Sequence, residues 1–281
     1  MITNPEAILN ALDPDQREAV EATRGPVCII AGAGTGKTRV ITHRVAYAIA
    51  TGVTDSSKSL ALTFTARAAG EMRTRLRDLG VANANARTFH SAALKQLMYF
   101  WPHTLGGAFP KLLPGKAPLI ANAIGSIDTY ITSSQSNLRD ISGEIEWAKA
   151  LEIPPHLYVE SALENGRSLR FPNAKDDKVN LSEVAKVYER YEYIKKQERV
   201  IDFEDVLLLT VGMLEEDRAV RERVRDQYRY FTVDEYQDVS PLQQRLLNLW
   251  LGNREELCVV GDPSQTIYSF AGATSVFLLS F

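Results

Sequence analysis

A glycine-rich loop between an apolar run and a helical pattern constrains this chain more than any other feature. The sequence AGAGTGKT occupies residues 31–38, after the apolar run 27–31 and at the start of a helix expected over 38–50. Small residues let such a loop curl until consecutive backbone N–H groups point at phosphate oxygens. The strict pattern has glycine where Ala31 stands, but the flanking strand and helix are those that a phosphate-binding loop needs. The loop predicts nucleotide binding.

We expect this loop to bind ATP together with Mg²⁺. Lys37 would bridge the β- and γ-phosphates, and the Thr38 hydroxyl would coordinate the metal ion. The cofactor-binding residues predicted from the loop are Ala33, Gly34, Thr35, Gly36, Lys37 and Thr38.

Two adjacent carboxylates, Asp234 and Glu235, follow the apolar run 230–233. In a parallel sheet this position is the carboxyl edge, where the phosphate-binding loop also lies. Asp234 would hold the Mg²⁺, and Glu235 would orient and deprotonate the attacking water. An isolated pair of this kind is usually an acidic surface turn, but its occurrence with the loop favours a nucleotide hydrolase.

A third polar segment follows the apolar run 257–260. Its Gln265 has an amide that can donate to a γ-phosphate or accept from the attacking water, so we count it as catalytic. Tyr268 and Phe270 lie just beyond, and either ring could stack on an unpaired base. Their spacing is equally compatible with two core residues.

The order of the patterns predicts an α/β fold with a parallel sheet, interrupted by a helical insertion. Strand and helix patterns alternate up to about residue 97 and resume after Asp202, a predicted helix cap with Asp205 three residues on. The stretch between is rich in proline and has no convincing buried strand. We therefore predict one discontinuous domain, 1–98 and 203–281, and a helical subdomain, 99–202. Cys28 and Cys258 lie in apolar runs and are expected to be buried thiols.

The net charge and the hydropathy of the chain limit the kinds of partner it can have. No apolar run approaches the roughly 18 residues of a membrane helix, and no signal peptide begins the chain, so a cytoplasmic protein without a membrane partner is expected. The formal net charge is −3, so DNA would need a local basic stripe. One predicted segment supplies such a stripe through Arg67, Arg73, Arg75 and Arg77.

These motifs, with several others in the same order, resemble the UvrD/PcrA/Rep-type superfamily 1 DNA helicases. The further matching segments are LDPDQREAV at 12–20, LTFTARAAGEM at 62–72, TFHS at 88–91, DFED at 202–205 and DEYQD at 234–238. The resemblance implies a RecA-like P-loop NTPase sheet with an inserted helical subdomain.

The resemblance also assigns roles to individual residues. It implies that Gln16 hydrogen-bonds adenine and that Arg39 lies beside the base. His90 would meet a DNA phosphate, although the residue type fits a buried hydrogen bond equally well. The residues that the resemblance and the aromatic spacing together assign to DNA are Phe64, Thr65, Arg67, His90, Tyr268 and Phe270.

The function so implied is an ATP-dependent DNA helicase that moves 3′ to 5′ on single-stranded DNA and unwinds duplexes. Repair or replication at the bacterial nucleoid, with repair proteins as partners, is the expected setting. Two departures qualify this. Ala271 stands where the family has arginine, which indicates a divergent branch, and the chain ends at Phe281, before a second RecA-like domain. We therefore expect an N-terminal fragment with weak hydrolysis and no unwinding of its own.

Three other functions compete with this interpretation, and one of them is the motor subunit of a helicase-nuclease complex. A nucleotide-gated DNA-binding or docking subunit without unwinding activity would use the same loop and aromatic segments. A phosphotransferase acting on a small molecule would use the loop, but it leaves the aromatic and arginine segments without a role.

Overall fold

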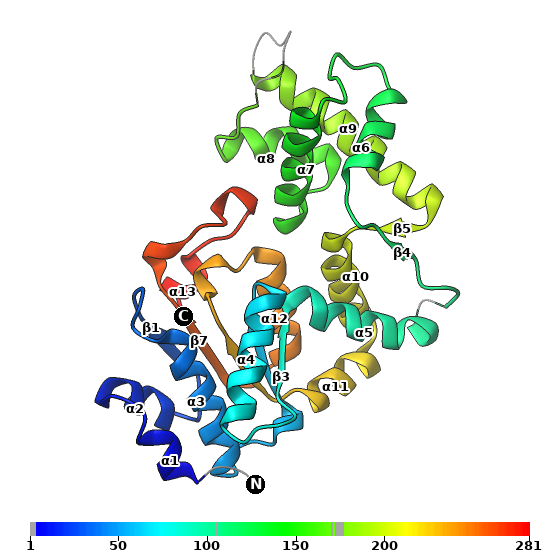
Figure 1. Ribbon diagram of the computed structural model, residues 1–281. Helices are drawn as coiled ribbons and strands as arrows, with labels where there is room; N and C mark the ends of the chain where they lie inside the picture. Colours follow the sequence, from blue (N-terminus) through cyan, green and yellow to red (C-terminus); the bar gives the residue numbers. More distant parts are fainter. Residues whose placement is uncertain (1–3, 105, 170, 172–176) are drawn as a thin grey trace.

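A five-stranded parallel sheet forms the centre of the molecule (Figure 1). The computed structural model describes residues 4–104, 106–169, 171 and 177–281. Within the sheet the spatial order is β1-β7-β6-β2-β3, so β1 and β3 are the edge strands. Both β2 and β7 are buried along their whole length, as expected for the inner strands of a covered parallel sheet. The strands are β1 (Val27–Ile30), β2 (Ser59–Thr63), β3 (Asn85–Thr88), β6 (Tyr230–Val233) and β7 (Leu257–Gly261).

The strand register brings all carboxyl ends to one edge of the sheet. Ile30 pairs with Gly261, while Val233 pairs with both Val259 and Leu62. The segments that follow β1, β7, β6, β2 and β3 therefore begin side by side. Ligands bind along this edge in open parallel sheets, so it is the natural place for a site.

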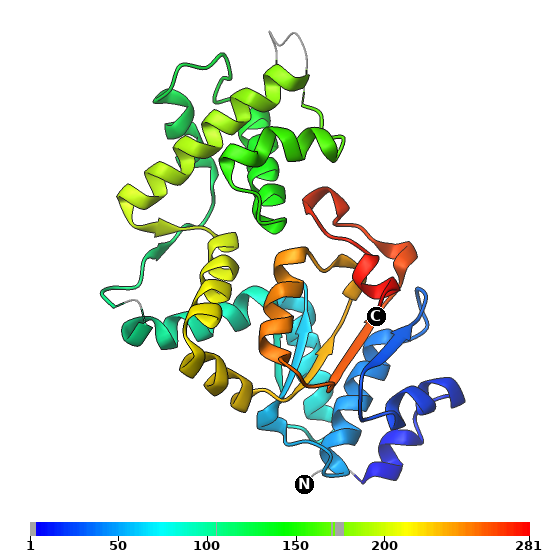
Figure 2. The same ribbon diagram turned by 180° about the vertical axis from the view of Figure 1, so that it is seen from behind.

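Helices cover both faces of the sheet (Figures 1 and 2). Successive residues of a strand point to opposite faces, and β2 divides accordingly: Leu60 and Leu62 join a core with α5, α10, α11 and α12, and Ala61 joins a core with α3 and α4. The result is a three-layer α/β/α arrangement. The helices of this part are α1 (Pro5–Leu9), α2 (Pro14–Glu21), α3 (Lys37–Ala50), α4 (Ala66–Asp78), α5 (Phe89–Thr104), α10 (Phe203–Glu216), α11 (Arg218–Gln227), α12 (Pro241–Leu251) and α13 (Val276–Leu279).

Between α5 and α10 the chain forms a separate group of helices, drawn at the top of Figure 1. It has its own apolar core, to which α9 contributes Val184, Val187, Tyr188, Tyr191 and Ile194. The helices of this group are α6 (Ala117–Gly125), α7 (Gln135–Ala150), α8 (Tyr158–Glu164) and α9 (Asp177–Glu198).

Two short strands lie at the base of this group. β4 (Lys111–Leu112) and β5 (Val200–Ile201) pair in parallel, but β4 is not buried and β5 is buried only at Ile201, so the expectation of no convincing buried strand in the insertion is not contradicted. Each has only two residues, too few for an alternating pattern to be visible in the sequence. The predicted bounds of the two domains remain a prediction, and they include residues 1–3, 105, 170 and 172–176, which lie outside the described residues.

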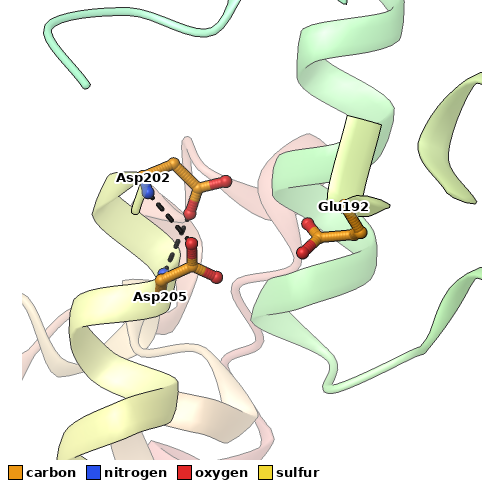
Figure 3. A group of neighbouring side chains, drawn as sticks. All are labelled: Glu192, Asp202 and Asp205. Atoms are coloured by element: carbon orange, nitrogen blue, oxygen red, sulfur yellow. Dashed lines mark hydrogen bonds between the residues drawn. The ribbon is translucent and has the colours of Figure 1, made fainter. Parts of the chain in front are cut away.

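Buried ion pairs join the helical group to the sheet part. Lys149 of α7 and Lys195 of α9 both contact the carboxylates of Asp202 and Asp205 at the start of α10, at 2.5–3.0 Å, and both contact Glu192. Asp202 and Asp205 also form the predicted capping box (Figure 3), each accepting the backbone N–H of the other. Because two ammonium groups already pair with these three acids, we interpret the cluster as an ion-pair network and not as a vacant cation site.

The sheet also shows where local patterns misled. The predicted strands and helices around the loops are confirmed to within about two residues, but β3 was not predicted, because its sequence NART is short and polar.

Cys258 is buried as expected, whereas Cys28 is exposed, so the expectation that Cys28 is a buried thiol is wrong. β1 is an edge strand in which partly buried and exposed positions alternate, so its apolar run does not lie inside the protein. Among the described residues, no helix combines the length and apolarity needed to cross a membrane.

Candidate nucleotide and DNA site

The glycine-rich loop joins the end of β1 to the first residue of α3. Gly36 is the N-cap of α3 with φ +87°, and no side chain within the described residues caps that first turn. Gly34 also has a positive φ, and a Cβ placed on it would meet nothing within 4 Å. The Thr35 hydroxyl donates to the Gly32 carbonyl at 2.8 Å and holds the curl. The helix N-terminus and open loop therefore match a phosphate cradle.

Gln16 and Arg39 both lie at this loop, as the resemblance implied. The Gln16 side chain donates from Nε2 to the Thr35 carbonyl at 3.0 Å, and it also completes the capping box of α2. A Cβ on Gly36 would come within 3.0 Å of that Nε2, so glycine is required there for this contact as well. Arg39 donates to the carbonyl of Ala11. These contacts bring the segment before α2 against the loop, and adenine binding by the two residues stays a prediction.

Asp234 and Glu235 follow β6, and only β7 separates that strand from β1. Two strand spacings, about 10 Å, therefore divide the acids from the loop. Asp234 is 6% exposed, and its pKa is raised to about 6 by burial and by the negative charge of Glu235, while the positive charge of Lys37 opposes this rise. A buried carboxylate beside a second acid is a setting that a divalent cation stabilises, so this donor set fits Mg²⁺.

A cleft of about 560 Å³ opens at this edge of the sheet. It is bordered by α3, by the segments after β2 and β6, and by the turn after β7. Seven of the residues predicted from the sequence line it: Thr38, Phe64, Thr65, Asp234, Glu235, Gln265 and Tyr268.

Gln237 is a residue of this site that the sequence interpretation left without a role. Its side chain is 1% exposed and donates from Nε2 to the Glu235 carboxylate at 2.7 Å. Its Oε1 accepts the backbone N–H of Asp262 at 3.0 Å, and a Cβ on Gly261 would lie only 2.4 Å from that oxygen. Gln237 therefore ties Glu235 to the turn after β7. An amide two residues after the acidic pair, able to donate and accept at once, was the available signal.

Gln265 belongs to that same turn, within the 3-10 helix η4 (Pro263–Gln265). Its amide donates to the Asp262 carboxylate, which also accepts the Ser264 N–H at 2.9 Å. A continuous set of hydrogen bonds therefore runs from Glu235 through Gln237 and the Asp262 backbone to Gln265. The acid and the glutamine predicted to be catalytic are held in one network.

Three aromatic rings lie close together near the cleft. Phe64 and Tyr268 are nearly parallel, with 6.0 Å between ring centroids and 8° between planes, and the Phe270 ring lies 6.2 Å from the Tyr268 ring and is tilted by 46° to it. Asp238 supports the turn by accepting the N–H groups of Ile267 and Tyr268. Phe270 is 65% exposed, so the alternative that both rings are core is wrong for Phe270. Base stacking stays a prediction.

Of the residues assigned to DNA, Arg67, His90 and Phe270 do not line the cleft, whereas Phe64, Thr65 and Tyr268 do. Thr65 caps α4 by accepting the Ala68 N–H, and Arg67, whose side chain is almost fully exposed, pairs with Glu71. In the arginine stripe, Arg73 donates to the Ala86 carbonyl and is committed to the fold. A neighbouring cavity of about 170 Å³ is lined by His90 together with Phe64 and Tyr268. The structure thus groups His90 with the aromatic rings.

His90 is partly buried and packs edge-on against Phe203. Burial and the positive charge of Lys116 lower its pKa to about 4. An unfolded chain takes up a proton on histidine below about pH 6.5 whereas the folded chain does not, so stability falls as the pH drops from about 6.5 toward 4.

We expect His90 to account for about 2 kcal/mol of the loss in unfolding free energy between pH 7 and pH 5. Urea unfolding at both pH values, on the wild type and on His90→Asn, measures this share. The variant should lose correspondingly less free energy over that interval. Equal losses in the two proteins would mean that His90 titrates normally.

Comparison with known proteins gives a consistent result. Residues 12–281 match the family of the UvrD/REP helicase N-terminal domain. The chain is 47% identical to the ATP-dependent DNA helicase UvrD2 of Mycobacterium tuberculosis strain H37Rv, over 98% of this chain and 40% of the relative. The ATP-dependent DNA helicases PcrA of Leuconostoc citreum and of Staphylococcus aureus strain NCTC 8325 are 32% and 31% identical, each over 98% of this chain and 36% of their own length. The chain thus spans about two fifths of these curated relatives.

Proposed function

Because the chain belongs to the UvrD/REP helicase family, we propose that it is the nucleotide-binding part of an ATP-dependent DNA helicase that moves 3′ to 5′ on single-stranded DNA and unwinds duplexes. Its setting is DNA repair or replication at the nucleoid of a bacterial cell, with repair proteins as possible partners, since the relatives are bacterial DNA helicases. The observation that supports this most is the meeting of the loop and the acidic pair at one sheet edge.

In this proposal the loop binds the phosphates of ATP. The N–H groups at the start of α3 and the Lys37 ammonium neutralise phosphate charge, while Gln16 and Arg39 hold the adenine. Thr38 and Asp234 hold Mg²⁺, which when bound neutralises charge on the β- and γ-phosphates. Glu235 accepts a proton from the attacking water, and Gln265 orients that water or the γ-phosphate.

The single strand would cross the same edge of the sheet. Phe64, Tyr268 and Phe270 present ring faces to bases, and Arg67 and His90 lie near the backbone. Support for this arrangement comes from Phe64 and Tyr268, which line the same cleft as Glu235 and Gln265. Because residues for ATP and residues for DNA line one cleft, the bound nucleotide would alter the affinity for DNA.

Replacing Lys37 by alanine tests the nucleotide site directly. We expect the affinity for ATP to fall by about 10- to 100-fold, because charge-assisted hydrogen bonds to phosphate contribute about 1.5–3 kcal/mol. Titration with a fluorescent ATP analogue measures the change, and Lys95→Ala on the exposed side of α5 is the matched control. Unchanged affinity in Lys37→Ala would remove the loop from the proposed site.

A further inference from the structure

Arg167 connects the helical group to the aromatic turn after β7. It lies just beyond α8, and its guanidinium packs over the Trp147 ring of α7, 4.4 Å from the ring centroid. One of its nitrogens, Nη1, donates to the backbone carbonyl of Phe270 at 3.2 Å. Phe270 belongs to the 3-10 helix η5 (Ser269–Ala271), which is more than 100 residues away in the chain. The contact therefore links the insertion to a segment predicted to bind DNA.

The guanidinium is fixed from its other side. Nε donates to the Glu144 carboxylate at 2.8 Å and Nη2 donates to the same group, a two-pronged pairing that only arginine can make. Glu144 is buried and also accepts the Tyr158 hydroxyl at 2.6 Å. Glu144 and Trp147 fix the plane of the guanidinium. The direction in which Nη1 donates is therefore set by these two residues, independently of the turn.

The turn that contains Phe270 packs closely against the end of α7. Gly272 follows η5 with φ +91°, and a Cβ on it would lie 2.4 Å from Cδ1 of Leu151 and 3.1 Å from Cβ of Ala150. The backbone of the turn therefore lies directly against the end of α7. Phe270 itself is 65% exposed. The backbone is held and the ring is left free.

We propose that Arg167 is a positioning residue for single-stranded DNA binding, which holds the turn 268–272 against α7 so that the Tyr268 and Phe270 rings keep their alignment with Phe64. This inference rests on the proposed function. It adds a role for the insertion: the helical group supplies the backbone anchor of the base-stacking turn.

The experiment perturbs the contact from both sides. Arg167→Lys keeps a positive charge beside Glu144 but cannot serve Glu144 and the Phe270 carbonyl together, whereas Gly272→Ala pushes the turn from α7 without touching Glu144. We expect each to weaken binding of a labelled oligo(dT) by about 5-fold, as the loss of one hydrogen bond predicts. Because both act on one contact, the double variant should be no weaker than the weaker single variant.

Further measurements separate positioning from folding. Affinity for a fluorescent ATP analogue should stay within about 2-fold of wild type in all three variants, because they leave the loop untouched. Arg190→Lys is the matched control, since Arg190 also stacks on a ring, that of Tyr193, and binds Ser126 inside the helical group. It should bind oligo(dT) like the wild type.

Phe270→Ala distinguishes failure of the inference from failure of the proposed function. If the wild type does not bind oligo(dT), or Phe270→Ala binds as well as wild type, the proposed DNA role of the turn fails. If Phe270→Ala weakens binding while Gly272→Ala does not, only the inference is overturned. The inference is also overturned if the losses of oligo(dT) affinity in Arg167→Lys and Gly272→Ala add in full in the double variant. Gly272→Ala remains decisive if Arg167→Lys does not fold.

Discussion

Replacing Glu235 by glutamine is expected to slow ATP hydrolysis by about 10²- to 10⁴-fold while nucleotide binding remains, because a positioned general base contributes a factor of that size. The glutamine has nearly the same shape but cannot accept a proton from water. Glu235 lies one residue after the buried Asp234 in the left-handed region, with φ +51°, and its carboxylate is held by Gln237. The side chain is therefore oriented by its surroundings and not by its own flexibility.

Single-turnover hydrolysis, with the protein in excess over labelled ATP, detects a rate loss even when basal turnover is slow. Glu255→Gln is the control, because this exposed acid lies at the opposite end of β7 from the cleft. It should hydrolyse ATP at the wild-type rate. Full activity in Glu235→Gln would exclude this residue as the general base.

Replacing Asp202 by alanine is expected to lower the free energy of unfolding by about 3–5 kcal/mol, since removing one partner of a buried ion pair leaves uncompensated charge. The variant leaves two buried ammonium groups, Lys149 and Lys195, with fewer carboxylates, and it removes the acceptor of the Tyr191 hydroxyl. It also removes the cap of α10, so several losses fall on one residue.

Urea denaturation measures this change, and Asp217→Ala is the matched control. Asp217 also caps a helix, α11, by accepting the Val220 N–H at 3.0 Å, and losing such a cap alone costs about 1 kcal/mol. A similar, small loss in both variants would show that capping, and not the ion network, explains the role of Asp202.

The same network sets a pH dependence with a definite sign. Burial alone would raise the pKa of Asp202, but the ammonium groups of Lys149 and Lys195 hold it well below its ordinary value. A carboxyl whose folded pKa is lowered contributes stability above its unfolded pKa, near 4, and loses it as the pH falls further. In the wild type this contribution is therefore complete at neutral pH, and the gap between the wild type and Asp202→Ala should narrow in acid.

Local patterns predicted the parts of the fold that depend on local chemistry. The strand 230–233, the helix after the loop and the Asp202 cap are all found as expected, because apolar runs and capping residues act within a few residues. Cys28 was misjudged because the same kind of run on an edge strand does not ensure burial. The polar strand β3 was missed because its pairing with β2 defines it, and not its own composition.

The site divides in the same way. Lys37, Asp234 and Glu235 were identifiable because each follows an apolar strand with a chemically specific side chain. The bridge made by Gln237 and the anchor made by Arg167 were not, since both depend on partners distant in the sequence. A glutamine or an arginine has no distinguishing local pattern until its partner is known.

The amino-acid sequence by itself determined the phosphate loop, the acidic pair and the alternation of strands and helices, because backbone curl, capping and apolar periodicity are short-range properties. Only the tertiary structure decided that β7 lies between the loop and the acids, that five charged side chains, three of them buried, meet at the base of the helical group, and that His90 lies partly buried near Lys116. These outcomes depend on strand order and on the water that packing excludes, and both arise from contacts between residues far apart in the chain.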